Sequence, residues 1–148
     1  WVNFESSINN ENIRKIIGGG LMKRVVVDMQ NALFADAIAT ALRDFDSDFE
    51  VFPSESPDKT TDMCADTQAN VLIMEVTAYT PWKIEERMKI RDEVKSYCPD
   101  CKIVLVVDEN TEKKLADKVR RAKKDGLIDN FLYGSVSATY LSAVVDTL

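Results

Sequence analysis

Three acidic side chains stand at the ends of short apolar runs, and they are the residues of this sequence best suited to chemistry. Asp28 ends a run of valines, Glu75 lies near the end of Val71–Val76, and Asp108 follows Lys102–Val107. Apolar runs of this length are typical of strands buried on both faces, and sites are built at the carboxyl ends of such strands in open parallel sheets. Carboxylate oxygens suit Mg²⁺, so the three acids could converge on a metal ion. The alternative is that they are solvated acids at strand ends.

Other catalytic arrangements find little support in the residue types. The sequence contains no histidine, which removes the commonest general base and any Ser-His or Cys-His nucleophile pair. Asp28-Met29-Gln30-Asn31 stands where a glycine-rich phosphate loop would follow the first strand, so nucleotide binding of that type is not expected. We therefore expect a protein that is not an enzyme.

A Cys-x-x-Cys spacing, Cys98-Pro-Asp-Cys101, is typical of redox or zinc sites. The pair follows a predicted helix, whereas reactive pairs of this kind lie at a helix N-terminus, where the thiol pKa is lowered. Zinc needs four ligands, and Cys64 brings the number of cysteines only to three. A plain loop is the favoured interpretation, and a redox or metal sensor is the alternative.

The segment Thr111–Lys124 gathers basic residues in an otherwise acidic chain. Seven lysines and arginines stand there against Glu112 and Asp117, whereas the net charge of the chain is −6. The segment is either a solvated helix surface or a surface for a protein partner, and the residues we assign to the partner surface are Lys113, Lys114, Lys118, Arg120 and Arg121. Nucleic-acid binding is less expected, because no aromatic residues are interleaved for stacking.

Length and composition indicate one globular domain. The chain has 148 residues, 45% of them hydrophobic and 30% charged, which is ordinary for a globular protein with its own core. Three cysteines make no disulfide framework, so we expect a reducing cytoplasm. No apolar run approaches the length of a membrane span, and there is no secretory signal, so no membrane partner is expected.

Strand-like and helix-like segments alternate from Met22 onward. The expected strands are Arg24–Asp28, Phe49–Pro53, Val71–Val76, Lys102–Val107 and Ile128–Tyr133. The expected helices are Asn31–Asp44, Ser56–Asp66, Pro81–Tyr97, Thr111–Lys124 and Ser137–Leu148. Strict alternation of this kind predicts an α/β protein with a parallel sheet between two helix layers. The specific prediction is a flavodoxin-like (βα)5 fold with strand order 2-1-3-4-5.

Helical spacing also selects apolar positions within three of the helices. They are Leu33, Phe34, Ile38, Ala41, Leu42 and Phe45 in the first helix, Trp82, Ile84, Met88, Val94 and Tyr97 in the third, and Leu141, Val144, Val145 and Leu148 in the last. We expect the last two sets to face the core.

Residues 1–21 differ from the rest of the chain. They begin with Trp1, end in Gly18-Gly19-Gly20-Leu21, and include a short helix-like stretch from Glu11 to Ile17. We favour an appended or fused segment with a glycine linker, so that Met22 is the natural start; a native extension is the alternative. The last helix runs to the final residue, which suggests a piece of a longer protein with an output domain C-terminal to residue 148.

From Met22 to Leu148 the chain resembles a response-regulator receiver domain. VVVDMQNALFADAIATAL is similar to the family's first strand, acidic pair and first helix, and NVLIMEV to the third strand, which carries the phosphoacceptor aspartate. KIVLVVDEN and DGLIDNFLYGSVSATYL are similar to the fourth strand and to the fifth strand with its turn. The order and spacing of the parts carry the resemblance, since the individual motifs are degraded.

The resemblance places the family's acidic site on three residues. The first acid of its pair is kept as Asp28, whereas the second, which in the family contacts Mg²⁺ directly, is Met29. The phosphoacceptor falls on Glu75, whose carboxylate lies one methylene farther out, about 1.5 Å. A thioether is a poor ligand for Mg²⁺, and phosphoryl transfer depends on exact placement of the acceptor.

Three further family positions fall in the last two strand–turn regions. The Thr or Ser that ends the fourth strand is Val107, just before Asp108, and the lysine is Gly134, followed by Ser135 in place of proline. Valine cannot hydrogen-bond a phosphoryl oxygen, and glycine supplies no cation. The switch aromatic is kept in type as Phe131.

The resemblance therefore implies a pseudo-receiver that keeps the fold and has lost aspartyl-phosphate chemistry. It implies a signalling module without a cofactor, acting through homodimerisation or a protein partner at the fourth helix, fifth strand and fifth helix. Any contact with nucleic acid would be made by an output domain. The alternatives are a Mg²⁺-dependent receiver phosphorylated on a non-standard acidic site, and a module in which Glu75 mimics the phosphorylated aspartate.

Overall fold

A computed structural model describes residues 22–108, 110–111 and 113–148, so the interpretation of residues 1–21 lies outside the described part of the chain. In that part, strands alternate with helices: β1 (Lys23–Asp28), α3 (Ala32–Phe45), β2 (Phe49–Pro53), α4 (Pro57–Thr67), β3 (Val71–Val76), α5 (Ile84–Tyr97), β4 (Lys102–Val107), α6 (Lys113–Lys124), β5 (Asn130–Tyr133) and α7 (Ala138–Asp146).

Local signals account for several of the element boundaries. Asn31 caps α3, and its Oδ1 accepts hydrogen bonds from the backbone nitrogens of Leu33 and Phe34 at 2.8 and 3.3 Å. Ser137 caps α7 in the same way. Gly126 follows α6 with a φ of +77°, the left-handed conformation that commonly ends helices and that glycine adopts without strain.

The five strands form one parallel sheet in the order β2-β1-β3-β4-β5, which confirms the predicted topology. β3 lies at the centre, where Val71 pairs with Val25 of β1 on one side and with Lys102 of β4 on the other. The ends of β1, β3 and β4 therefore lie next to one another at one edge of the sheet. Asp28 pairs with Met74, and Val76 pairs with Val107.

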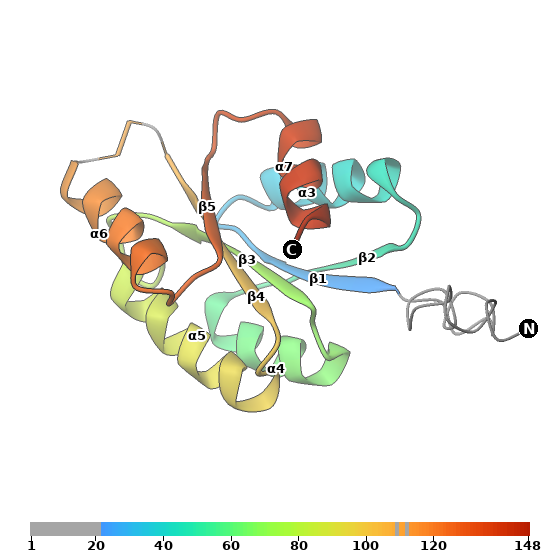
Figure 1. Cartoon of the computed structure of the whole chain (residues 1–148), viewed down its shortest axis with the longest axis horizontal. Helices are drawn as coiled ribbons and strands as arrows, with labels where there is room; N and C mark the ends of the chain where they lie inside the picture. Colours follow the sequence, from blue (N-terminus) through green and yellow to red (C-terminus); the bar gives the residue numbers. More distant parts are fainter. Residues whose placement is uncertain (1–21, 109, 112) are drawn as a thin grey trace, which may run out of the picture.

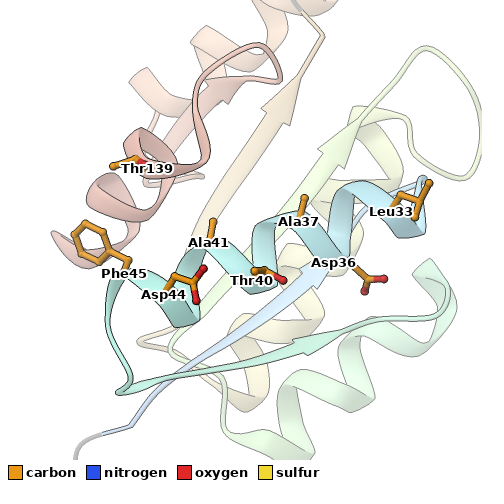
Figure 2. A pocket seen from close by; sticks show the side chains of 8 residues that line it. All are labelled: Leu33, Asp36, Ala37, Thr40, Ala41, Asp44, Phe45 and Thr139. Atoms are coloured by element: carbon orange, nitrogen blue, oxygen red, sulfur yellow. The ribbon is translucent and has the colours of Figure 1, made fainter.

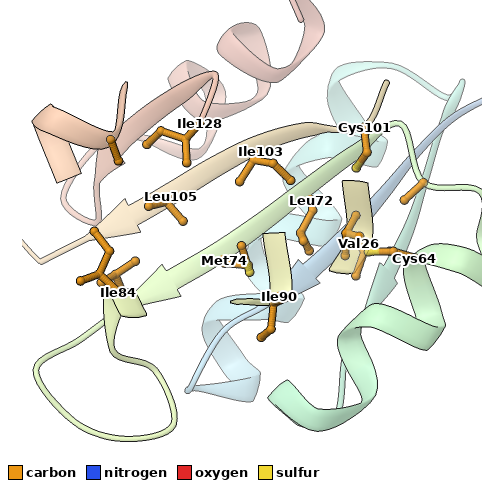
Figure 3. Close-up of a cluster of buried hydrophobic side chains, with 14 of the residues drawn as sticks. Val26, Cys64, Leu72, Met74, Ile84, Ile90, Cys101, Ile103, Leu105 and Ile128 are labelled. Atoms are coloured by element: carbon orange, nitrogen blue, oxygen red, sulfur yellow. The ribbon is translucent and has the colours of Figure 1, made fainter. Parts of the chain in front are cut away.

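Two helix layers cover the sheet, and each closes its own core (Figure 1). α3 and α7 pack on one face, over Val25, Val27 and Ile73 among others. α4, α5 and α6 pack on the other face, and Figure 3 shows the residues of that core, including Leu72, Met74 and Ile103. Successive side chains of a strand point to opposite faces, so the apolar runs of β1, β3 and β4 supply both cores.

The apolar positions that helical spacing selects in α3 and α5 match the buried faces only in part, and the expectation that Tyr97 faces the core was wrong. In α3 the buried side chains are Ala35, Ile38, Ala39 and Leu42, whereas Leu33, Phe34 and Phe45 are exposed. Tyr97 of α5 is also exposed, and the inner face of that helix holds Ile84, Arg87, Ile90 and Val94. Both differences arise because the apolar residues of these helices cover more than one face, so spacing alone did not choose the buried one.

α7 matches its expectation, since Leu141 and Val145 are buried and Val144 and Leu148 pack against the same core. Among the described residues, none of the helices is long and apolar enough to cross a membrane.

Candidate functional site

Asp28 ends β1 with its side chain turned toward the layer of α4 and α5, where it is buried. There it meets Arg87 of α5. The Nη1 atom of Arg87 lies 2.6 Å from Oδ2 of Asp28, and Nη2 lies 3.3 Å from Oδ1. The guanidinium therefore engages both carboxylate oxygens in the two-pronged geometry that makes arginine–carboxylate pairs strong.

Arg87 is fully buried, with 0% of its surface exposed. Its Nε donates to the backbone carbonyl of Glu75 at 2.7 Å, and Nη2 also reaches the backbone carbonyl of Asp28 at 3.3 Å. A buried cation is tolerated only when it is paired and hydrogen-bonded. Arg87 meets that condition and ties α5 to the ends of β1 and β3 at the same time.

Two hydroxyl groups complete the surroundings of the Asp28 carboxylate. Thr60 of α4 donates from Oγ1 to Oδ2 of Asp28 at 2.7 Å. The hydroxyl of Ser54, which follows β2, lies 2.9 Å from that of Thr60. Oδ2 of Asp28 therefore accepts from both Thr60 and Arg87.

The other two acids of the predicted cluster have separate surroundings. Glu75 is half-buried, and its Oε1 accepts a hydrogen bond from the backbone nitrogen of Gln30 at 2.7 Å. Asp108 is exposed, and its Oδ1 accepts from the backbone nitrogen of Asn110. Within the described residues there is no group of three acids, cysteines or histidines that could hold a metal ion, so the convergence of Asp28, Glu75 and Asp108 was not found.

Met29 lies on the opposite side of the sheet from the Asp28 carboxylate. Its side chain is buried in the core under α3 and α7. The two residues point apart because side chains alternate along an extended backbone. The residues at this edge do not fit a receiver-type Mg²⁺ site. Both carboxylate oxygens of Asp28 are hydrogen-bonded to the guanidinium of Arg87, and the side chain of Met29 has no oxygen to offer a metal ion.

Val107 and Gly134 lie side by side at the ends of β4 and β5. The backbone nitrogen of Gly134 donates to the carbonyl oxygen of Val107 at 2.8 Å, and Val107 is buried. A Cβ atom added to Gly134 would lie 3.9 Å from that oxygen, an ordinary contact. The space next to the backbone would therefore admit the Cβ atom of a larger residue such as lysine at position 134.

Phe131 is partly buried in β5 and makes two contacts with its neighbours. The ammonium group of Lys123 lies 5.8 Å from the centre of its ring, and the ring of Tyr133 meets it edge to face at 6.0 Å. These contacts place the predicted switch aromatic against α6.

The basic residues of α6 divide into two groups. Lys118 pairs with Glu85 of α5 at 3.0 Å, and Arg120 pairs with Asp117 and hydrogen-bonds the hydroxyl of Tyr133. Lys123 hydrogen-bonds Oδ1 of Asn130 at 3.1 Å and belongs to the same group. The second group has neither an ion pair nor a side-chain hydrogen bond with any described residue and consists of Lys113, Lys114, Arg121 and Lys124, all exposed. We call these four residues the α6 basic face.

The three cysteines are free and buried. Cys98 and Cys101 flank a turn closed by a hydrogen bond from the Cys101 nitrogen to the Cys98 carbonyl, and the Cys98 thiol approaches the Cys64 carbonyl at 3.5 Å. Burial raises the pKa of the Cys101 thiol to about 12 and raises that of Cys64 further. Thiols held in the protonated form are poor nucleophiles and poor metal ligands.

Sequence reasoning missed Arg87, Thr60 and Ser54. A signal for Arg87 was available, because it lies midway between Ile84 and Ile90 on the inner face of α5. A cation on an apolar face needs a buried acid, and Asp28 ends a strand that faces this helix. The hydroxyl groups gave no comparable signal, since serine and threonine are frequent in loops and near helix starts in general.

Comparison with known proteins supports the fold. No protein-family model and no curated protein sequence matches the chain. Among solved structures, a response regulator from Thermotoga maritima is 16% identical with a TM-score of 0.67, over 86% of this chain and 97% of that one.

Two further structures extend the comparison. A DNA-binding response regulator of the LuxR family from Staphylococcus aureus is 12% identical with a TM-score of 0.66, over 84% of this chain and 97% of that one. A CheY-like protein (tadZ) from Pseudomonas aeruginosa is 16% identical with a TM-score of 0.63, over 84% and 98%. The described part of the chain thus has the flavodoxin-like fold of response-regulator receiver domains.

Proposed function

We propose that this chain is a pseudo-receiver, a signalling module that works through protein–protein contacts and without phosphorylation. The observation that carries the proposal is the ion pair of Arg87 with Asp28, whose Nη1–Oδ2 distance is 2.6 Å. An internal guanidinium then provides the positive charge that a metal ion provides in a phosphorylated receiver. The module needs no cofactor and is not an enzyme.

Other residues at this edge of the sheet support the same proposal. Glu75 is fixed by the Gln30 nitrogen, Val107 offers no hydroxyl group, and Gly134 offers no cation. A phosphoryl group on Glu75 would therefore lack the metal ion, the hydroxyl group and the lysine that stabilise its charge in the receiver family.

The surface we assign to partners is formed by α6, β5 and α7. It carries the α6 basic face and the exposed ring of Tyr140. We propose that it binds a second copy of the chain or an output domain C-terminal to residue 148. A DNA-binding output is one candidate, because the similar Staphylococcus aureus protein is described as a DNA-binding response regulator. The proposed compartment is the cytoplasm.

Phosphoryl transfer from a small donor tests the proposal. The protein is incubated with Mg²⁺ and acetyl phosphate, and its intact mass is measured beside that of a receiver domain known to be phosphorylated. We expect the mass of this chain to stay unchanged while the control gains a phosphoryl group. An adduct that disappears in a Glu75→Gln or an Asp108→Asn variant would overturn the proposal in favour of a Mg²⁺-dependent receiver with a non-standard acceptor.

A further inference from the structure

The outer side of α3 forms a groove that the described residues of the chain leave open (Figure 2). It is lined by Leu33, Asp36, Ala37, Ala41, Asp44 and Phe45, and we call it the α3 groove. Leu33 is 79% exposed and Phe45 43%, although both are large apolar residues that favour burial. Asp36 and Asp44 are exposed and form no ion pair with any described residue.

The apolar residues of the α3 groove follow helical spacing. Leu33, Ala37, Ala41 and Phe45 are each four positions apart, so they form one stripe along the helix. The buried side of α3 lies elsewhere, at Ala35, Ile38, Ala39 and Leu42. The stripe with its two acids is thus a second apolar face, and packing among the residues that the structure describes does not explain it.

The α6 basic face has the complementary chemistry. Its four cations project from a helix with one acid, Asp117, which is already paired with Arg120. The helix is strongly positive in a chain whose net charge is −6, so the rest of the chain carries a net negative charge. Long basic side chains also carry apolar stems, which can cover an apolar stripe while their charged ends reach carboxylates.

The α3 groove and the α6 basic face cannot meet within one molecule. α3 packs on one face of the sheet and α6 on the other (Figure 1). A contact between them joins two copies, and it leaves one copy with an unused α6 basic face and the other with an unused α3 groove. Contacts of this type are heterologous and extend into chains unless a rotation closes them into a ring.

We propose that the α3 groove binds the α6 basic face of a second copy, head to tail. Asp36 and Asp44 would pair with the basic ends, and the stems of Lys114 and Arg121 would lie over the apolar stripe. This inference rests on the proposed function, since it names the partner of the α6 surface. Exposed ion pairs are individually weak and are screened by salt, so the association is concentration-dependent and weakens as ionic strength rises.

Charge reversal on each surface tests the head-to-tail contact. One variant carries Asp36→Lys and Asp44→Lys, and the other carries Lys114→Glu and Arg121→Glu. Molar mass is measured by light scattering over a range of concentrations at low salt. We expect the unmodified chain to grow beyond a dimer, and each variant alone to stay a monomer.

A mixture of the two variants gives the sharpest result. One variant keeps its α6 basic face and the other keeps its α3 groove, so a single wild-type contact can form between them. We expect the equimolar mixture to recover the association that each variant alone has lost, because the two unmodified surfaces can meet and the two reversed surfaces are also opposite in charge. A matched control, Asp62→Lys with Asp66→Lys on α4, makes the same charge change at exposed residues elsewhere and should still grow as the unmodified chain does.

The outcomes separate this inference from the proposed function. If the α3 variant still associates while the α6 variant does not, the contact is symmetric through α6 and the head-to-tail inference is wrong. An unmodified chain that is monomeric at every concentration also overturns it. Neither result affects phosphorylation independence, which fails only if the phosphoryl adduct forms.

Discussion

At the scale of single residues, the guanidinium of Arg87 takes up the carboxylate that a receiver would offer to a metal ion. It contacts both oxygens of Asp28 and the carbonyl of Glu75, and all three groups belong to the edge of the sheet where the site was expected. The result is a buried ion pair in which the charge of the Asp28 carboxylate is neutralised by a side chain of the same protein.

Removing the Arg87 charge tests this arrangement directly. An Arg87→Met variant keeps much of the side-chain volume but leaves the Asp28 carboxylate buried without its cation. We expect its free energy of unfolding to fall by about 3–5 kcal/mol, as is typical when one partner of a buried ion pair is removed. The measurement is urea denaturation followed by circular dichroism.

Two further variants make the Arg87 test specific. Lys89→Met removes an exposed cation from the same helix and should change stability by no more than about 0.5 kcal/mol. Adding Asp28→Asn to Arg87→Met should recover part of the loss, because the unpaired charge is gone. A loss below about 1 kcal/mol in Arg87→Met would show that the pair is not what holds this edge together.

The buried thiols lead to a prediction about pH. Since burial raises the pKa of Cys101 to about 12, the folded state favours the protonated thiol, and the unfolded thiol ionises first, near its ordinary value of about 8.5. The contribution of this thiol to stability is complete below about pH 8.5 and is lost as pH rises toward 12.

The accessibility of the thiols gives a separate test. We expect a thiol reagent at pH 8 to label the native protein slowly and to label all three cysteines of the urea-unfolded protein. Rapid labelling of native Cys98 or Cys101 would instead favour a redox role.

At the scale of secondary-structure elements, α3 shows why spacing alone did not identify the buried face. Its apolar residues occupy two faces, one in the core and one in the α3 groove, and sequence periodicity treats them alike. Only the packing of the helix against β1, β2 and α7 separates them.

A pair of alanine substitutions in α3 measures that difference. Leu42→Ala empties a fully buried site and should cost about 2–5 kcal/mol, whereas Leu33→Ala, at a site that is 79% exposed, should change stability by less than about 0.5 kcal/mol. Thermal and urea unfolding report both values. Similar losses for the two variants would mean that the outer face of α3 is buried in solution.

The glycines at the ends of α6 and β5 give a second test at this scale. Gly126 has a φ of +77°, and nothing lies within 4 Å of an added Cβ, so Gly126→Ala should cost about 1–2 kcal/mol through backbone strain alone. Gly134 has ordinary space for a Cβ, so Gly134→Ala should be close to neutral. A larger loss at Gly134 than at Gly126 would contradict this account of both turns.

The elements were largely predictable because their signals are local. Continuous apolar runs marked the strands, and Asn31, Ser137 and Gly126 marked helix ends where the structure has them. The carboxylate site was less predictable, because its geometry depends on a contact between residues 59 positions apart. The position of Asp28 at a strand end was correct, but its ion pair with Arg87 was not predicted, because strand patterns do not reveal a partner on a helix.

At the scale of the whole molecule, the sheet separates three features. Its carboxyl edge holds the buried Asp28–Arg87 ion pair, and the α3 groove and the α6 basic face lie on opposite sides of it. The loop that leaves β3 carries Trp82, whose backbone is hydrogen-bonded to Thr77 and Tyr79 of the same loop. Its indole Nε1 is buried and has no hydrogen-bond partner among the described residues. Trp82 lies in the loop between Glu75 and α5, so we use its fluorescence as the reporter for this edge of the sheet.

Trp82 fluorescence during a titration with Mg²⁺ and then beryllofluoride, in a Trp1→Phe background, tests the central claim most directly. We predict no saturable change in either step, because the Asp28 carboxylate that Mg²⁺ would need is already paired with Arg87. A saturable response to both would contradict that claim and would show that the acidic edge still binds a metal ion and a phosphoryl mimic.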